Sequence, residues 1–185
     1  FSSKALSDRI NDADCNILIT ADGGFRAAKI TPLKDISDEA MQSTPSIEKC
    51  IVLERTKSEV AMESGRDVWW RDEMEKVTAD CPIEIMDSED PLFILYTSGS
   101  TGKPKGIQHS TAGYMIYTEY SFRNVFQYNE GDIYWCTADI GWITGHSYIV
   151  YGPLLAGATT MMFEGVPSYP DAGRFWQIAE ENKVN

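Results

Sequence analysis

The stretch that decides the fold class reads Pro91-Leu92-Phe93-Ile94-Leu95-Tyr96-Thr97-Ser98-Gly99-Ser100-Thr101-Gly102-Lys103-Pro104-Lys105-Gly106. Its apolar first part, 91–95, predicts a buried strand, and the segment 110–126 that follows the loop predicts a helix. A loop rich in glycine, serine and threonine between a strand and a helix can turn backbone N–H groups toward a phosphate, because glycine permits close approaches that a side chain would block. Hydroxyl groups and lysines add donors and positive charge. The loop therefore predicts a polyphosphate site.

The loop does not fit the Walker A pattern, in which a glycine is followed four residues later by Gly-Lys-Ser/Thr. Position 97, where the first glycine is required, is threonine, and Gly102-Lys103 is followed by Pro104. This mismatch and the absence of a second motif bearing an aspartate disfavour a P-loop phosphotransferase. A flexible linker is also disfavoured, since linkers rarely separate an apolar strand from a helix.

Length, charge and hydropathy restrict the class of protein further. The chain has 185 residues, enough for one domain with its own core, and 43% hydrophobic residues, an ordinary share for a soluble protein. Its net charge of −12 argues against nucleic acid as a partner, because the nucleic-acid backbone requires clustered Lys and Arg. No apolar run reaches the ~18–20 residues that span a bilayer, and no signal peptide is found. We expect a cytoplasmic protein without a membrane partner, which holds anionic ligands through local groups.

Cysteine and histidine are too sparse and scattered for a metal centre. Cys15, Cys50, Cys81 and Cys136 form no Cys-x-x-Cys pair, and the chain has only two histidines. This pattern disfavours a zinc site, so no metal ligands are assigned. We expect free, buried thiols in a reducing cytoplasm.

Strand-like and helix-like segments alternate along the chain. We expect strands at 16–20, 49–53, 91–95, 132–137 and 158–163, and helices at 2–11, 38–43, 69–78, 110–126, 145–155 and 171–182. Ser2 or Ser3 is expected to cap the first helix. A turn is expected at 22–24, a polar surface loop at 54–66, and an interruption of the 145–155 helix at Gly152-Pro153. The alternation predicts an α/β fold with mostly parallel sheets flanked by helices. The chain starts without Met and stops where a strand would begin, so we expect both ends to be cut within a longer protein.

The loop from Thr97 to Gly106 resembles, in all ten positions, the signature of the acyl-adenylate-forming superfamily. This superfamily includes acyl-CoA synthetases, luciferases and nonribosomal-peptide adenylation domains. The segments 19–26, 137–148, 151–154 and 163–167 are similar to motifs of one of its families, the AMP-forming acetate–CoA ligases or acetyl-CoA synthetases. The resemblance covers the whole chain and implies that residues 1–185 are part of the large N-terminal, AMP-binding domain, with the C-terminal domain absent.

The resemblance implies a two-step ligase reaction. Acetate attacks the α-phosphate of Mg·ATP to give acetyl-AMP and pyrophosphate, and CoA then displaces AMP. The loop would hold the β- and γ-phosphates through Thr97, Ser98, Gly99, Ser100, Thr101, Gly102, Lys103, Lys105 and Gly106. ATP with Mg²⁺ and CoA would be co-substrates, and most Mg²⁺ contacts, the adenine site and the adenylation lysine would lie outside this chain.

Trp142, Ile143 and Thr144 resemble the acyl pocket of this family. Trp142 would form a wall between the acetate pocket and the CoA tunnel, and Thr144 would contact both, which makes these two the expected catalytic residues. Ile143, at a position that is usually valine in bacterial relatives, would line the pocket for the methyl group. Without the surrounding motif, Trp142 would be interpreted as a buried core aromatic.

Arg26 and Lys29 resemble the basic pair that meets the 3′-phosphate of CoA. Lysine keeps the charge of the arginine common at position 29 but loses its bidentate geometry. Ser168 matches a further CoA-contacting position. On the residues alone, Arg26 and Lys29 would be a solvated loop pair.

Two other residues near these motifs are expected to have structural roles. Two alternative functions also remain open. His146 is expected to hydrogen-bond locally, because acetate is already ionised and needs no general base, and Asp139 is expected to form a turn. The first alternative is a propionyl- or other short-chain acyl-CoA synthetase. The second is that these residues alone form an inactive partial module that binds nucleotide or CoA. The sequence does not predict the oligomeric state.

Overall fold

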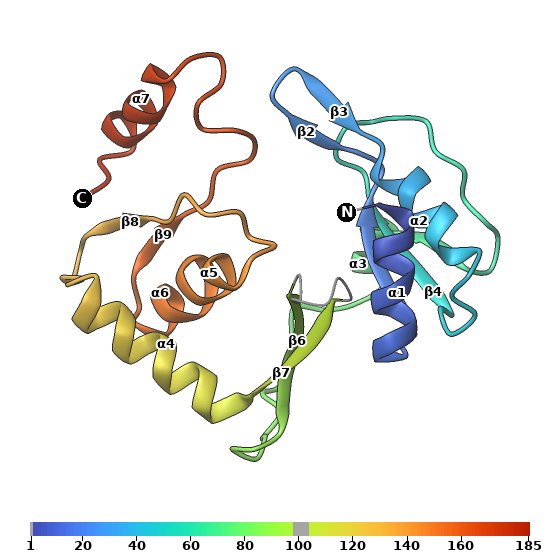
Figure 1. Cartoon of the computed structure of the whole chain (residues 1–185), viewed down its shortest axis with the longest axis horizontal. Coiled ribbons are helices and arrows are strands. Elements are labelled where there is room, and N and C mark those ends of the chain that lie inside the picture. The colour runs from blue at the N-terminus through green and yellow to red at the C-terminus, as the bar shows by residue number, and fades with distance from the viewer. Residues whose placement is uncertain (1, 98–103) are drawn as a thin grey trace. The chain divides into compact units, whose positions relative to one another are not determined.

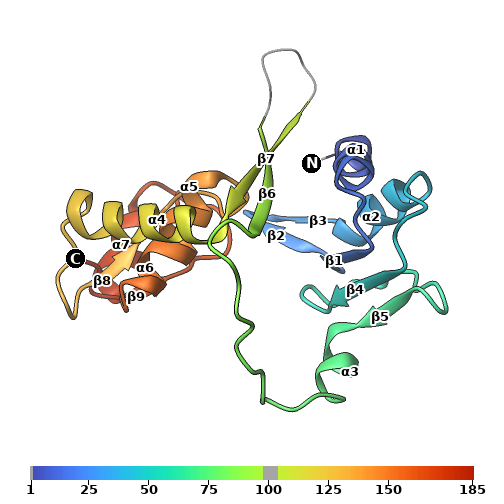
Figure 2. The same cartoon turned by 90° about the horizontal axis from the view of Figure 1, so that it is seen from below.

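The computed structural model describes residues 2–97 and 104–185, which form two compact units (Figures 1 and 2). Unit 1 comprises 1–84 and 96–106, and unit 2 comprises 85–95 and 107–185. Within the described ranges, no helix is both long and apolar enough to cross a membrane.

Unit 1 is built on a parallel sheet with the strand order β1-β4-β5. Its elements are α1 (Ser3–Ala13), β1 (Ile17–Ala21), β2 (Gly24–Arg26), β3 (Lys29–Thr31), α2 (Leu33–Met41), β4 (Lys49–Leu53), β5 (Asp67–Trp69) and α3 (Trp70–Met74). Met41, Cys50 and Val52 form the buried core, and Leu18 and Trp69 pack against them. The sheet therefore carries its core on the face to which alternate residues of β4 point.

Several expected boundaries in unit 1 are confirmed and others are wrong. Ser2 caps α1 as expected, because its Oγ accepts the Ala5 N–H at 3.2 Å. The short helix expected at 38–43 begins earlier, at Leu33, directly after Pro32. The helix expected at 69–78 is only α3, because Asp67–Trp69 pair with β4 as a strand that the sequence did not indicate.

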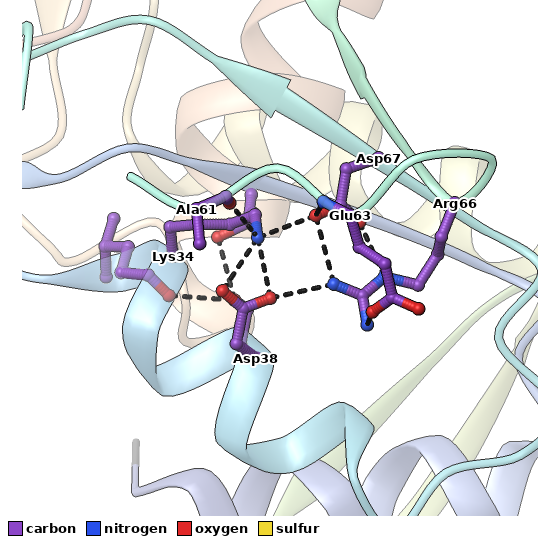
Figure 3. Close-up of polar contacts among 9 residues, drawn as sticks. Lys34, Asp38, Ala61, Glu63, Arg66 and Asp67 are labelled. Atoms are coloured by element: carbon purple, nitrogen blue, oxygen red, sulfur yellow. Dashed lines mark hydrogen bonds and ion pairs between the residues drawn. The ribbon is translucent and has the colours of Figure 1, made fainter. Parts of the chain in front are cut away.

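A buried ion network holds α2 against β5 (Figure 3). The ammonium group of Lys34 is fully buried and contacts Asp38 Oδ1 at 2.6 Å, Asp67 Oδ2 at 2.8 Å and the Ala61 carbonyl at 2.9 Å. Arg66 completes the network, since its Nε lies 2.6 Å from Asp67 Oδ1 and its Nη2 lies 2.9 Å from Asp38 Oδ1. Burial by itself would raise the pKa of Asp67, but the hydrogen bonds from Arg66, Lys34 and the backbone outweigh it and lower that pKa to about 2.

The segment 54–66, expected as a polar surface loop, is tied to the sheet by Asp22. This buried carboxylate accepts backbone N–H groups from Gly23 at 2.7 Å, Arg55 at 2.8 Å, Thr56 at 2.9 Å and Ser58 at 2.9 Å. These hydrogen bonds outweigh the effect of burial and lower the pKa of Asp22 to about 2. Asp22 thus organises a loop distant in sequence, beyond the local turn expected at 22–24.

Unit 2 combines helices with a second parallel pair of strands. Its elements, counting the two strands shared across the unit boundary, are β6 (Pro91–Thr97), β7 (Lys105–Ser110), α4 (Thr111–Val125), β8 (Ile133–Trp135), α5 (Ile143–Gly145), the π-helix η1 (His146–Tyr151), α6 (Gly152–Leu155), β9 (Thr159–Met161) and α7 (Gly173–Glu181). β8 and β9 are parallel, with Tyr134 opposite Thr160. With the pairs in unit 1, this confirms an α/β fold with mostly parallel pairing; the β2–β3 pair is antiparallel.

The expectation that the glycine-rich loop joins a strand to a helix is wrong. The loop joins β6 to β7, which pair with each other, and α4 begins only at Thr111. The first turn of α4 is already satisfied elsewhere, because Thr111 N–H donates to the Asp90 carbonyl at 2.9 Å and Ala112 N–H to the Ser88 carbonyl at 3.1 Å. The N-terminus of α4 is therefore occupied by the backbone of 88–90.

The strand expected at 91–95 is confirmed as part of β6, but the expectation that it is buried is wrong, since Ile94 is 44% exposed. Within the described residues β6 pairs only with β7, so one neighbouring strand covers it instead of two. The side chains of 92, 93, 95 and 96 are half-buried.

The helix expected at 145–155 is not interrupted at Gly152-Pro153. Its helical turns are wider just before these residues, at His146–Tyr151. Residues 143–155 are continuously helical, with a π-helical segment in which Gly152 N–H donates to the Ser147 carbonyl five residues before it. Pro153 has no N–H to offer the Ile149 carbonyl, and its ring would clash with that carbonyl in a regular α-helix. The Thr160 hydroxyl donates to Ile149 O at 3.3 Å instead. Pro153 does disturb the regular α-helix, as expected, but the result is a wider π-helical turn and not a break in the helix.

Candidate functional site

In unit 1, a tight antiparallel hairpin presents Arg26 and Lys29. The register pairs Arg26 with Lys29 across the two-residue connection Ala27-Ala28, where Ala27 has a left-handed φ of 53°. Both side chains are exposed, and neither forms an ion pair with a carboxylate among the described residues. Like charges directly opposite each other repel, so the pair would be stabilised by a shared anion.

In unit 2, a turn at Asp139 fixes the start of the segment that carries Trp142. The Asp139 carboxylate accepts the Gly141 N–H at 2.8 Å, and its carbonyl accepts the Trp142 N–H at 3.1 Å. The following helix then passes directly over this turn, because a Cβ atom on Gly145 would lie 2.5 Å from the Asp139 carbonyl oxygen. The expected role of Asp139 as a turn former is confirmed, and Gly145 is required by the close approach.

The three positions that the sequence resemblance to the ligase family predicts for an acyl pocket all face outward within unit 2. Trp142 is 67% exposed, Ile143 is 40% exposed, and Thr144 is exposed as well. The interpretation of Trp142 as a core aromatic is wrong. An indole left this exposed, on a turn fixed by hydrogen bonds, is available to contact a ligand.

His146 hydrogen-bonds locally, as expected. Its Nδ1 lies 3.0 Å from the Trp142 carbonyl oxygen, which also accepts the His146 backbone N–H at 3.1 Å. A carbonyl oxygen can only accept, so the ring must carry its hydrogen on Nδ1.

The remaining expected site residues lie in loops or strand ends. Thr97, Lys105 and Gly106 are exposed at the ends of β6 and β7, and Ser168 is exposed between β9 and α7. The other loop residues assigned from the sequence, Ser98, Gly99, Ser100, Thr101, Gly102 and Lys103, lie outside the described residues.

One contact next to the loop was not foreseen. The Tyr96 hydroxyl donates to Asp12 Oδ2 at 2.6 Å, which connects the end of β6 to helix α1 within unit 1. Burial and this hydrogen bond to a carboxylate raise the pKa of Tyr96 to about 12, so the phenol stays protonated at neutral pH. No sequence signal links these residues, because they are far apart in the chain.

A pocket of about 380 Å³ lies at the carboxyl ends of β4 and β5 in unit 1. It is lined by Val52, Leu53, Glu54, Trp69, Trp70, Arg71, Asp72 and Met74. None of the described residues that were assigned from the sequence lines this pocket, although this end of a parallel sheet is a common place for ligands.

The described cysteines differ in burial. Cys50 is buried, which raises the pKa of its thiol to about 11, while Cys15 and Cys136 are half-buried and Cys81 is exposed. All four are free, but the expectation that they are buried holds only for Cys50. Among the residues that the structure describes, no three His, Cys, Asp or Glu side chains are grouped so as to hold a metal ion.

The two sets of expected residues therefore belong to different units: the structure pairs Arg26 with Lys29 in unit 1 and groups 142–144 in unit 2. The parallel strand pairs flanked by helices place the chain among α/β proteins, and its sequence carries a glycine-rich loop. The AMP-binding enzyme family matches residues 1–185, and the chain belongs to this family.

Particular members of the family are similar over the whole chain. It is 59% identical over 185 residues to an acetyl-coenzyme A synthetase of Desulfatibacillum aliphaticivorans and 56% identical to acetyl-coenzyme A synthetase 2 of Pseudomonas aeruginosa. All of the chain is covered in both comparisons, and it spans 29% of the length of each relative. Among solved structures, the acetoacetyl-CoA synthetase from Streptomyces lividans superimposes with a TM-score of 0.88 at 26% identity, over all of this chain and 28% of that one.

Proposed function

We propose that the protein containing this chain ligates acetate to CoA with ATP, through an acetyl-AMP intermediate, and releases AMP and pyrophosphate. The observation that carries this proposal is the unbroken similarity of all 185 residues, at 55–59% identity, to proteins named acetyl-coenzyme A synthetase. The enzyme would act on small-molecule substrates in the cytoplasm, as an AMP-forming ligase.

The first half-reaction must overcome charge repulsion, since a carboxylate attacks a triphosphate. The loop from Thr97 to Gly106 supplies hydroxyl, backbone N–H and lysine donors, and we assign to it the β- and γ-phosphates and the departing pyrophosphate. Mg²⁺ would accompany ATP. Most of the protein contacts to Mg²⁺ would lie outside these 185 residues.

The second half-reaction requires a pocket that holds the acetyl group and admits the thiol of CoA. The exposed Trp142 on its fixed turn would separate these spaces, Ile143 would contact the acetyl methyl group, and Thr144 would contact both ligands. The exposed cations Arg26 and Lys29 would bind the 3′-phosphate of CoA, and the exposed Ser168 would donate a further hydrogen bond.

The function is tested on the purified full-length protein by acetate-dependent exchange of pyrophosphate into ATP and by formation of acetyl-CoA. Both activities should require Mg²⁺. Lys103→Ala should slow the exchange by roughly 10²–10³-fold, the usual effect of removing one preorganised donor. The same variant should convert synthetic acetyl-AMP and CoA nearly normally, because pyrophosphate has left before CoA attacks. An equal loss in both half-reactions would contradict the assignment of the loop.

Two alternatives are separated by the same assays. A preference for propionate or another short acid over acetate would make the protein a different acyl-CoA synthetase; the fold is shared with an acetoacetyl-CoA synthetase. Residues 1–185 expressed alone are expected to show no acetate-dependent exchange, and a partial module of this kind would at most bind nucleotide or CoA.

A further inference from the structure

We infer that His146 is a positioning residue for acyl selection, acting through the backbone of Trp142. The inference rests on the proposed function, because it gives a structural neighbour of the acyl pocket a role in that reaction. His146 itself is not assigned any contact with a substrate.

The carbonyl of Trp142 is the point at which the ring acts. Trp142 has an extended backbone, with φ −100° and ψ 157°, and is the N-cap of the helical segment that follows. Its carbonyl oxygen accepts the backbone N–H of His146 at 3.1 Å and the Nδ1–H of the same residue at 3.0 Å. A regular helix supplies only the first of these bonds, so the imidazole adds a second restraint on the peptide that joins Trp142 to Ile143.

This restraint matters because the indole itself is little supported. At 67% exposure, the Trp142 side chain has few neighbours in unit 2 to define where it points. Among these 185 residues, its direction is therefore set mainly by the backbone, which is held by the Asp139 turn on one side and by His146 on the other. A small rotation of this peptide would move the indole and Ile143 together.

The imidazole is in turn held by aromatic packing. Its ring centroid lies 5.3 Å from that of Phe93 in β6, and Tyr151, one helical turn further on, also packs on Phe93 at 5.8 Å. On the next residue, the Ser147 hydroxyl is hydrogen-bonded to the Tyr114 hydroxyl at 2.7 Å in the buried interior. These contacts fix both the ring plane and the start of η1, so the Nδ1–H donor is preorganised toward the carbonyl.

His109 provides a matched control within the same cluster. Its ring packs on Phe93 at 4.8 Å and on Tyr114 at 4.9 Å, so it shares the aromatic environment of His146. It lies on β7 and makes no hydrogen bond with Trp142 among those of the described residues. Replacing each histidine by phenylalanine therefore preserves ring packing in both cases and removes the Trp142 restraint in only one.

The experiment compares His146→Phe, His146→Asn and His109→Phe in the full-length enzyme. Asparagine places its side-chain N–H near the position of Nδ1, so it keeps the donor and loses the ring. The readout is the ratio of kcat/KM for acetate to kcat/KM for propionate, with the melting temperature measured in parallel. We expect His146→Phe to lower this ratio by about tenfold, the scale of discrimination that one methylene in a pocket provides. His146→Asn and His109→Phe should stay within about twofold of wild type.

The outcomes decide the inference. It is overturned if His146→Phe leaves the ratio unchanged, or if His109→Phe changes it equally, because ring packing alone would then explain the effect. If His146→Phe does not fold, a changed ratio in folded His146→Asn overturns it and an unchanged ratio supports it. If the wild-type protein activates neither acid, the proposed function fails, whereas an active wild type with an indifferent His146→Phe removes only this inference.

Discussion

Replacing Lys34 by methionine should loosen unit 1 far more than any exposed lysine would. The Lys34 side chain is fully buried, and its ammonium contacts two carboxylates, on Asp38 and Asp67. Methionine fills a similar volume but leaves Asp67, which is also fully buried, with Arg66 as its remaining cation. Removing one partner from a buried ion pair costs about 3–5 kcal/mol, because it leaves an uncompensated charge in the interior.

The matched control is Lys4→Met. Lys4 makes the same i,i+4 pair with an aspartate, Asp8, but its side chain is 81% exposed. An exposed helical pair of this kind contributes only about 0.3–0.5 kcal/mol. The two substitutions therefore change the same residue type, in the same local pattern, at opposite extremes of burial.

Native-state hydrogen exchange of peptides from 33–41 and 67–69 measures the effect, because these segments hold the two sides of the network. A loss of about 3–5 kcal/mol corresponds to exchange about 10²- to 10⁴-fold faster. The double variant Lys34→Met/Asp67→Asn should recover part of the loss, since the uncompensated charge is gone. An effect of Lys34→Met below about tenfold, or strict additivity in the double variant, would refute the reasoning.

The pH dependence follows from the same network. The pKa of Asp67 is lowered from 3.8 to about 2, which corresponds to stabilisation on the order of 2 kcal/mol. A carboxyl whose pKa is lower in the folded state stabilises it fully above the unfolded pKa. The protection of these segments against hydrogen exchange should therefore be constant above about pH 5 and be lost as the pH falls from about 4 toward 2. Lys34→Met should move this loss to higher pH.

Three further predictions concern the other features described. Gly145→Ala should lower kcat/KM for acetate by at least about tenfold, because its Cβ would lie 2.5 Å from the Asp139 carbonyl oxygen; an unchanged value would show that the turn adjusts freely. Arg26→Ala should raise KM for CoA but not for dephospho-CoA, and leave acetate-dependent ATP–pyrophosphate exchange intact; equal effects on both thiols would make Arg26 a surface residue. Asp22→Asn should accelerate hydrogen exchange at 54–58 by about ten- to hundredfold, since an amide cannot accept every N–H that the buried carboxylate holds; unchanged exchange would assign the order of this loop to other contacts.

The elements that could be predicted are those whose signal is local. The strands at 49–53 and 16–20 are visible in the sequence as apolar runs. Ser2 lies next to the helix that it caps, and the turn at Asp139 is formed by atoms within three residues of each other. Their energetics depend on near neighbours in the sequence, so pattern reasoning finds them.

The elements that were missed depend on distant partners. β7 contains Gly106, Gln108 and His109 and has no apolar alternation, so only its pairing with β6 makes it a strand. A buried Lys34 contradicts the ordinary preference of lysine for the surface, and it is tolerated only because Asp67 arrives from another part of the chain. For the candidate site, the sequence pointed to 142–144 and to a local hydrogen bond of His146, but not to the Trp142 carbonyl as the partner of that bond.

The π-helical segment gives Pro153 an influence on a site that it does not touch. A residue turns the chain by about 100° in an α-helix and by less in a wider π turn. If His146–Tyr151 tightened into a regular α-helix without losing a residue, Trp142, Ile143 and Thr144 would swing around the helix axis by about one residue's rotation relative to α6. Pro153 opposes that tightening, because its ring would meet the Ile149 carbonyl. Pro153, near the end of the helical segment, thus limits how far the residues at its beginning can rotate about the helix axis.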